Sequence, residues 1–269
     1  MLTRRPKAAV AIVLVLATTL VFAAQGGAAD RAARGGRWRI PSRPSWYWQL
    51  SGKLRTDVRA QLYDVDGFET SAAQVAALHA RGIRVICYVD VGTAEKWRPD
   101  YRRFPRSVLG RPDAGWPGER WIDIRARAVE PIMRARFSMC ARKGFDAVEA
   151  DNIEAFSNPT GFQITAVEQL AYNRWVARAV HAFGMDVLQK NDGVQSARQV
   201  RYFDGALSEE CNQWRECAAF RPYLRAGKPV LDAEYRLPTA RFCAADAVAG
   251  IMGARYDLAL DGRRYEPCW

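Results

Sequence analysis

The sequence predicts an α/β protein with a single (β/α)₈ (TIM) barrel domain, and three features support this fold class. Short runs rich in β-branched and aromatic residues alternate with helical stretches from residue 46 onward. The alternation repeats about eight times, which favours a parallel sheet with helices outside it. The chain also lacks the glycine-rich phosphate turn that an open doubly wound sheet usually carries. The closed barrel is therefore the prediction, and the open sheet is the alternative.

The strands are predicted from short apolar runs, most of which end in a polar or acidic residue. They cover residues 46–50, 61–66, 83–91, 145–151, 185–191, 203–209, 228–234 and 256–261. A further run, 120–124, ends the Pro/Gly-rich segment 103–120, and we assign it outside the barrel. We expect this segment to form a long loop over the C-terminal mouth, where functional loops of such barrels lie.

Four longer helices are predicted from apolar residues at helical spacing, each followed by a glycine. They cover residues 71–82, 126–144, 165–184 and 241–253. Together with the strands, they place the barrel domain at residues 46–269.

The N-terminus has the layout of a secretory signal peptide. A basic start, MLTRRPK, precedes an apolar run over residues 8–23 and the small-residue run AQGGAADRA. Cleavage after Ala23 or Ala29 is expected, so residues 1–29 form the signal peptide and leader, and residues 30–45 a flexible segment. The alternative is an uncleaved membrane anchor, because the apolar run is only slightly short for a span. We expect a secreted protein with no stable membrane insertion after cleavage.

The basic charge does not by itself indicate a nucleic-acid partner. The formal net charge is +11, but arginines are spread along the chain, and no zinc-finger, helix-turn-helix or RNA-binding signature appears. We therefore expect solvated basic surfaces and no nucleic-acid binding.

Six cysteines, an even number, fit an exported protein. Cys211 and Cys217 are close enough in sequence to close one loop, and Cys243 and Cys268 are candidates to tie the C-terminus to the last helix. Two interpretations stay open for the remaining two, Cys87 and Cys140: a third disulfide or two buried thiols. The chain has two histidines, both in predicted helices, and no CxxC motif, so we expect no metal and no cofactor.

Polar residues at the strand ends mark the candidate site, because active residues of such barrels lie at the C-terminal ends of the strands. Helix caps and turns account for about half of them. They do not account for Glu149 and Asp151, which are two residues apart and therefore share a strand face. In a barrel strand with helices outside, that face is the interior.

Several carboxylates on converging strands, without a nucleophile–histidine pair, suit acid/base chemistry on a polar substrate. Glycoside hydrolysis uses such a pair, one as nucleophile or base and one protonated to release the leaving oxygen. Sugars also need flat apolar platforms, and Trp97 and Trp116 in predicted loops, together with Tyr88 near a strand end, are candidates.

These residues lie within motifs that resemble glycoside hydrolase family 114, the endo-α-1,4-polygalactosaminidases. The ordered motifs cover residues 46–245 and read WYWQLSG, LYDVDGFET, GIRVICYVDVGTAEKWRPDYRRFP, VLGRPDAGWPGERWIDIR, GFDAVEADNIEAFSNPTGF, LQKND, ALSEECNQWREC and GKPVLDAEY. The resemblance implies a (β/α)₈ barrel and endo-cleavage of α-1,4-linked galactosamine-containing polysaccharide. EADN stands where the family commonly has EPDN, and YVDVG has a larger strand-end residue than usual.

The resemblance also implies a catalytic pair, Asp151 in EADN and Glu209 in SEEC. Glu210 is adjacent to Glu209 and also acidic, and strand alternation does not decide between them. We expect a retaining mechanism, with the inverting one as the alternative. A non-catalytic carbohydrate-binding barrel at the cell surface is the alternative function.

Supporting roles are expected for other strand-end residues. Lys190 is predicted to pair with Glu149 or Asp151, and Glu149 is predicted to support the nucleophile rather than act as a second catalytic acid. Asp64 and Asp66 are expected to bind sugar hydroxyls or an amine, although Asp66 equally suits a turn before Gly67. The complete set of expected binding or supporting residues is Asp64, Asp66, Tyr88, Trp116, Glu149, Asn152, Lys190, Asn191, Glu210, Glu234 and Tyr235. The expected partner is the polysaccharide, and the expected state is a monomer.

Overall fold

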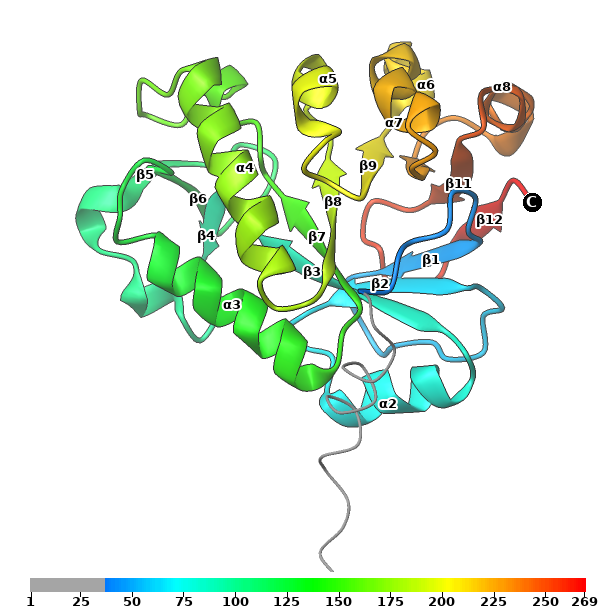
Figure 1. The fold of residues 1–269 in the computed structure, drawn as a ribbon, viewed down its shortest axis with the longest axis horizontal. Helices are drawn as coiled ribbons and strands as arrows, with labels where there is room; N and C mark the ends of the chain where they lie inside the picture. The colour runs from blue at the N-terminus through cyan, green and yellow to red at the C-terminus, as the bar shows by residue number, and fades with distance from the viewer. Residues whose placement is uncertain (1–36) are drawn as a thin grey trace, which may run out of the picture. The chain divides into compact units, whose positions relative to one another are not determined.

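Parallel strands follow one another around a barrel in the computed structural model, which describes residues 37–269 (Figure 1). The strands, in order, are β1 (Trp46–Gln49), β2 (Leu62–Asp66), β3 (Arg84–Asp90), β7 (Ala147–Asp151), β8 (Asp186–Lys190), β9 (Gly205–Glu209), β10 (Val230–Glu234) and β11 (Met252–Tyr256). Each of these strands except the last pairs in parallel with the strand that follows it in this series. The predicted TIM barrel is confirmed. The expected signal peptide, residues 1–29, lies outside the described residues.

Helices cover the outside of the barrel between consecutive strands (Figure 1). They are α2 (Ala72–Ala80), α3 (Glu130–Lys143), α4 (Ala166–His181), α5 (Ser196–Gln199), α6 (Cys211–Trp214), α7 (Arg221–Arg225) and α8 (Cys243–Ala249). Short 3₁₀ helices lie in the connections: η1 (Tyr101–Arg103), η2 (Arg106–Val108), η3 (Ala155–Ser157), η4 (Gly193–Gln195), η5 (Cys217–Phe220) and η6 (Thr239–Arg241). The connection from β1 to β2 contains no helix, so the eight-fold alternation is incomplete there.

Local sequence signals set the ends of the longer helices. Ser71 with Gln74, and Thr165 with Glu168, form capping boxes at the starts of α2 and α4. Gly144 ends α3 in the left-handed conformation, with φ of 93°, which a residue without a Cβ adopts at little cost.

The Pro/Gly-rich segment after β3 is more ordered than a plain loop. It forms a three-stranded antiparallel sheet in the order β4 (Thr93–Glu95), β6 (Glu119–Ile122), β5 (Leu109–Pro112). The run at 120–124 thus belongs mainly to β6, outside the barrel as expected. We call residues 93–122 the excursion.

The expected bounds of the last helix and of the last parallel strand are wrong, although their order is right. The strand predicted at 256–261 is β11 at Met252–Tyr256, and the helix predicted at 241–253 ends at Ala249. The reason is local: Gly250 takes a left-handed conformation with φ of 84° and stops the helix early. Asp257 and Asp261 therefore lie in a turn after β11, where each accepts a hydrogen bond from a backbone N–H group.

A short antiparallel strand fills the seam of the barrel. β12 (Tyr265–Pro267) pairs with β11, and β1 and β12 are the two ends of the nine-stranded order. Tyr265 donates to the carbonyl of Trp46 at 2.8 Å, and the Trp46 indole donates to the Met252 carbonyl at 2.8 Å. Side chains thus close the gap between β11 and β1.

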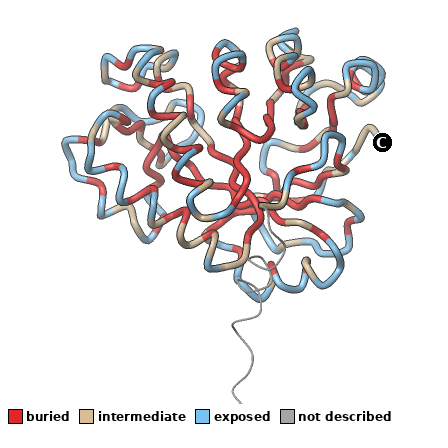
Figure 2. Tube along the Cα trace, in the orientation of Figure 1, coloured by how far each residue is buried: buried red, intermediate tan, exposed pale blue. Residues whose placement is uncertain are grey.

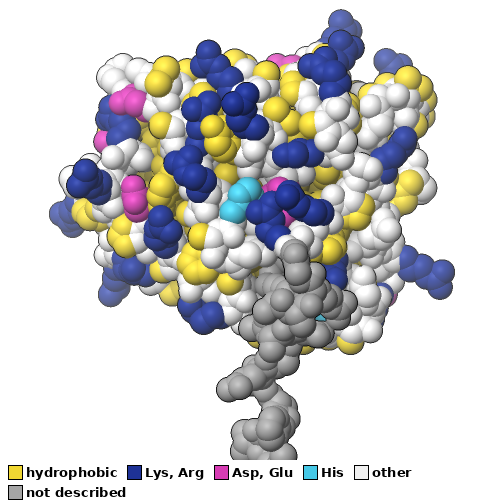
Figure 3. All heavy atoms as spheres, in the orientation of Figure 1, with side chains coloured by type: hydrophobic (Ala, Val, Ile, Leu, Met, Phe, Trp, Pro, Cys, Tyr) yellow, Lys and Arg dark blue, Asp and Glu magenta, His cyan; other side chains and the backbone are white. Residues whose placement is uncertain are grey.

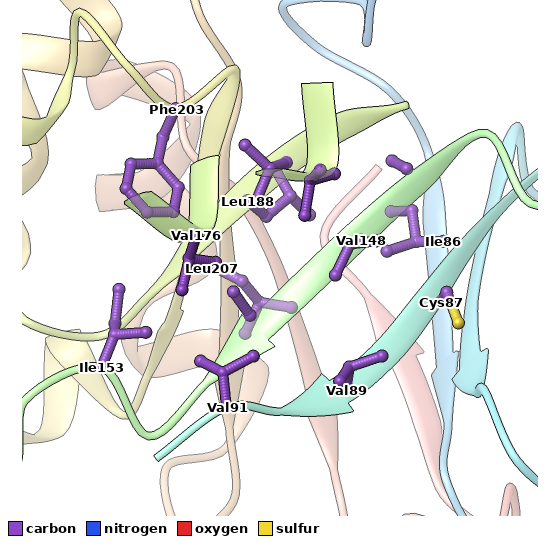
Figure 4. Close-up of a cluster of buried hydrophobic side chains, with 14 of the residues drawn as sticks. Ile86, Cys87, Val89, Val91, Val148, Ile153, Val176, Leu188, Phe203 and Leu207 are labelled. Carbon is purple, nitrogen blue, oxygen red and sulfur yellow. The ribbon is translucent and has the colours of Figure 1, made fainter. Parts of the chain in front are cut away.

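The core is buried between the strands and the helices, as the red strand segments of Figure 2 show. Figure 4 shows part of it, with Ile86, Val148 and Leu188 from three neighbouring strands and Val176 from α4. Three disulfides reinforce this unit. Cys211–Cys217 and Cys243–Cys268 confirm the expected pairs, and Cys87–Cys140, which the sequence left open, joins β3 to α3.

The described part of the expected flexible segment 30–45 contacts the barrel. Arg37 forms ion pairs with Asp186 and Asp204 at 2.5 and 2.7 Å, and Ile40 is buried. These long-range pairs hold residues 37–40 against the barrel, whereas composition alone had indicated flexibility.

The surface is basic without a single cluster in view. Lys and Arg side chains are scattered over the face in Figure 3, between hydrophobic and neutral groups. Within residues 37–269, no helix has both the length and the apolar character needed to cross a bilayer.

Candidate active site

A cavity of about 720 Å³ opens where the strands end. The strand residues that line it are Trp48, Asp66, Tyr88, Asp151, Lys190 and Glu209. The excursion contributes Glu95, Trp97, Arg98, Asp113, Trp116 and Glu119, and the turn before β12 contributes Leu258, Ala259 and Leu260. The cavity is thus built at the end of the barrel where the sequence analysis expected the site.

Lys190 occupies the centre of the cavity floor. Its Nζ lies 2.9 Å from Glu149 Oε1, 3.3 Å from Asp151 Oδ1 and 3.2 Å from Glu209 Oε2. It also lies 4.7 Å from the centre of the Trp48 ring, which favours a cation. Burial works against the charged amine, but the three carboxylates outweigh it and hold the pKa of Lys190 well above its usual value.

Asp151 is the last residue of β7 and is held on both oxygens. Oδ1 contacts Lys190, and Oδ2 accepts a 2.9 Å hydrogen bond from the Tyr88 hydroxyl on β3. Asn152, which follows with φ of 59°, donates to Asp90 at 2.8 Å and also lines the cavity.

Glu209 is the last residue of β9 and lines the cavity, whereas Glu210 does not. The amide of Asn191 donates to Glu209 Oε2 at 2.9 Å, and the Tyr235 hydroxyl donates to Oε1. The backbone turns at Glu210, with φ of 55°, and its carboxylate lies 3.6 Å from Arg236 instead. Of the two adjacent acids, Glu209 is therefore the one that lies in the cavity.

Glu149 and Asp64 form a buried acid pair beneath Asp151. Glu149 accepts from Lys190 and from the Trp48 indole at 3.1 Å, and burial raises its pKa to about 7. Asp64 hydrogen-bonds Glu149; burial, and then the Glu149 charge, raise the Asp64 pKa well above its usual value. Asp64 is fully buried and does not line the cavity, so the expected sugar contact is wrong.

The hydrogen bonds bear on two further expectations, those for Asp66 and Glu234. Asp66 lines the cavity, and it also accepts from the N–H groups of Phe68 and Glu69 and from Arg98, which is the turn-making role that the sequence left as the alternative. Glu234 accepts from the backbone of Asn212 at the start of α6 and does not line the cavity. Strand alternation explains this, because its neighbour Ala233 pairs with Glu209 and takes the inward position.

The profile of glycoside hydrolase family GH114 matches residues 27–267 of the sequence. The chain belongs to this family. It is a glycoside hydrolase.

Solved structures agree with this assignment. The structure of Aspergillus fumigatus Ega3 in complex with galactosamine is similar, with a TM-score of 0.82 and 29% identity over 87% of this chain and 98% of that one. The glycoside hydrolase domain of PelA from Pseudomonas aeruginosa shares the fold, with a TM-score of 0.65 and 13% identity over 82% of this chain and 97% of that one. A Deinococcus radiodurans protein described as uncharacterized is 27% identical, and the match covers 71% of each chain.

The hydrolase also places side chains in its cavity that the sequence analysis missed. Glu154, three residues after Asp151, lines the cavity; burial, followed by the charges of Asp151 and Asp192, raises its pKa well above the usual value. The Glu119 pKa is raised to about 10, chiefly by burial. Glu154 lies within the acid-rich stretch VEADNIEAF, so its position after a strand end was the available signal.

The two exposed tryptophans of the hydrolase lie where platforms were expected. Trp97 is 55% exposed and Trp116 is 47% exposed, and both line the cavity from the excursion.

One potential metal-ligand group occurs within residues 37–269 of the hydrolase: Cys211, Cys217 and Asp232. The two cysteines form a disulfide, so neither sulfur is available as a thiolate ligand.

Proposed function

We propose that this glycoside hydrolase is a secreted, endo-acting enzyme that cleaves α-1,4-linked galactosamine-containing polysaccharide. In this proposal Asp151 is the nucleophile and Glu209 is the general acid/base. The observation that carries it is the shared contact of both carboxylates with Lys190 on the cavity floor. Family membership and the likeness to Ega3, which was solved with galactosamine, support the substrate class.

The proposed reaction proceeds in two steps. Asp151 attacks the anomeric carbon while Glu209 gives its proton to the departing glycosidic oxygen, which leaves a glycosyl–Asp151 ester. Glu209 then takes a proton from water, the water oxygen bonds to the anomeric carbon, and Asp151 is released. Lys190 and the Tyr88 hydroxyl contact the two oxygens of Asp151 and hold its carboxylate in position for the first step.

The spacing of the two carboxylates supports retention of configuration. Asp151 Oδ1 and Glu209 Oε2 contact the same nitrogen at 3.3 and 3.2 Å, so they cannot be farther apart than these two distances together. The largest possible separation of these two oxygens therefore lies at the lower end of the ~6.5–9.5 Å range of inverting pairs, whereas retaining pairs are ~5–5.5 Å apart.

The charge of the cavity supports a cationic polymer as substrate. Acidic side chains line the cavity from the strands and from the excursion and outnumber the two cations, Arg98 and Lys190. A cleft in which one sign of charge predominates concentrates counter-ions even when the net charge of the protein opposes them. The basic, apolar N-terminal sequence and the three disulfides support secretion.

The decisive experiment compares three variants on partly deacetylated α-1,4-galactosaminan. We expect Asp151→Asn and Glu209→Gln each to reduce kcat by about 10²–10⁴-fold or more, because each removes a proton-transfer or nucleophilic group. Glu210→Gln is the matched control and should keep near wild-type kcat, because Glu210 lies outside the cavity lining. Reducing-end release measures rate, and mass spectrometry of the products measures endo-cleavage.

NMR of the first products gives the stereochemical result, and α-anomers are expected. Initial β-anomers would overturn retention, and full activity of Glu209→Gln would remove Glu209 from the mechanism. Binding of the polymer without any reducing-end release by the wild type would select the non-catalytic alternative.

A further inference from the structure

Glu154 differs from the other buried or half-buried acids that line the cavity, because one oxygen of its carboxyl is buried and unpaired. This oxygen, Oε2, has no hydrogen-bond partner among residues 37–269. Its backbone carbonyl, in contrast, accepts from Ser157 and Asn158 at 2.8 and 3.1 Å. The main chain is thus fixed at the start of η3, while the carboxyl faces the cavity without a ligand from the protein.

The other buried or half-buried acids that line the cavity all have donors. Asp151 has Tyr88, Glu209 has Asn191 and Tyr235, Asp66 and Glu95 have Arg98, Glu119 has Thr93, and Asp113 has backbone N–H groups. A buried carboxyl group without a hydrogen bond costs about 1–3 kcal/mol. The unpaired position of Glu154 therefore fits a group that is completed by a ligand.

The charges around Glu154 specify what that ligand carries. Three nearby negative charges raise the pKa of Glu154: Asp151 at the end of β7, Asp192 two residues after β8, and Glu209 at the end of β9. Lys190 is the cation that acts on it, and its amine is already shared by three carboxylates. The local charge balance is therefore negative, and a ligand that brings a positive charge is favoured there.

We propose that Glu154 binds the ammonium group of an amino sugar in the cavity and thereby selects deacetylated over acetylated residues. This inference rests on the proposed function, which supplies the amino-sugar polymer. The ammonium N–H donates to the Glu154 carboxylate, so binding favours the ionised form of Glu154, and a proton held by its carboxyl in the free enzyme leaves to water. An N-acetyl group has no positive charge and cannot induce that release.

The raised pKa of Glu154 in the free enzyme has a physical basis that supports the proton release. Burial is the largest cause that raises its pKa, and Asp151, Asp192 and Glu209 add to it while Lys190 opposes it. A cation placed against the carboxyl reverses this balance by favouring the ionised form.

Calorimetry with single sugars tests the proposal without requiring turnover. Galactosamine and galactose are titrated into the full-length wild type and into Glu154→Gln at pH 6, in two buffers with different ionisation enthalpies. The wild type should prefer galactosamine and release a proton on binding it. Glu154→Gln should bind galactosamine about 10- to 100-fold more weakly, the range for a charge-assisted hydrogen bond, and should release no proton. Galactose binding should change far less.

Glu210→Gln is the matched control, since it removes a neighbouring acid that does not line the cavity. It should keep the preference and the proton release of the wild type. An unchanged preference or proton release in Glu154→Gln overturns the proposal, as does a loss of kcat with unchanged galactosamine binding, which would place Glu154 in bond cleavage. Polymer cleavage by the wild type is measured alongside, so that failure of the proposed function is seen separately.

Discussion

Lys190 is the residue on which the charge balance of the cavity floor depends. It is 2% exposed, and it contacts acids from its own neighbouring strands β7 and β9. Glu149 and Asp64 extend this network into the barrel, where burial raises the pKa of both acids. Neither lines the cavity, so we predict that they act on Asp151 through Lys190 rather than by contact with substrate.

Removal of the Glu149 charge should lower stability as well as activity. In Glu149→Gln the Lys190 amine loses its shortest ion pair in a buried site, and we expect the free energy of unfolding to fall by about 3 kcal/mol. Asp151→Asn should cost less, because Asp151 lies at the cavity edge. Melting curves beside activity assays check this. A Glu149→Gln variant that melts like wild type yet has no turnover would show that Glu149 acts directly in the chemistry.

Unlike Glu149→Gln, Asp64→Asn should gain stability relative to the wild type as the pH rises, because the Asn amide keeps a donor to Glu149. The folded-state pKa of Asp64 is raised, so wild-type folding takes up a proton above the unfolded value of ~3.9, and stability falls as pH rises from there. Asn has no proton to take up. Denaturant unfolding at pH 5 and pH 8 should show the variant gaining on the wild type at the higher pH, and an equal difference at both would contradict a protonated Asp64.

At the scale of elements, two aspartates fix strands and helices at the bottom of the barrel. Asp146 precedes β7 and accepts from the Val85 N–H of β3 and from His79 at the end of α2. Asp204 precedes β9 and accepts in the same way from Val187 of β8 and from His181 of α4. Each aspartate thus joins a strand to the helix that packs against it.

The hydrogen bonds of these two aspartates predict that the folded state loses stability in acid. Burial raises the pKa of Asp204, but the hydrogen bond from His181 and other partners outweigh it, so the folded-state pKa is lowered. The stabilisation is present above the unfolded value of ~3.9 and is lost as pH falls through the folded value. Asp204→Asn should cost about 3 kcal/mol at pH 7, with the difference from wild type shrinking below about pH 4. Denaturant unfolding across this range checks it, and a difference independent of pH would contradict the assignment.

At the scale of the whole molecule, closure of the barrel depends on the last residues of the chain. Tyr265 packs against Tyr47 and Tyr256, with ring centres 5.0 and 5.7 Å away, and hydrogen-bonds Trp46. The Cys243–Cys268 disulfide holds this strand beside α8. The C-terminus therefore stabilises β1, which carries Trp48 of the cavity.

Substitution of Tyr265 should separate packing from hydrogen bonding at the seam. Tyr265→Phe removes one hydrogen bond and should cost about 1 kcal/mol, whereas Tyr265→Ala also removes half-buried ring contacts and should cost about 2–3 kcal/mol. These costs correspond to Tm decreases of about 2–4 °C and 5–10 °C. Val248→Ala, at a position 93% exposed, is the control. Equal melting of Tyr265→Ala and the control would show that the seam does not depend on Tyr265.

What the sequence by itself determined is the part of the structure that depends on local patterns. Strand and helix alternation predicted the barrel, Ser71 and Thr165 marked helix starts, and acids at strand ends located the cavity with Asp151 and Glu209. Such signals are readable because side-chain periodicity and end capping involve residues only a few positions apart.

The tertiary structure alone decided the features that depend on register and on contacts between distant residues. The register of β9 against β10 places Glu209 rather than Glu210 in the cavity. The sequence did not predict β12, because this strand is defined by its pairing with β11. The raised pKa of Asp64 follows from its burial and from the charge of Glu149, which lies on a strand far away in sequence. Desolvation and charge coupling act through space, so no local pattern in the chain encodes them.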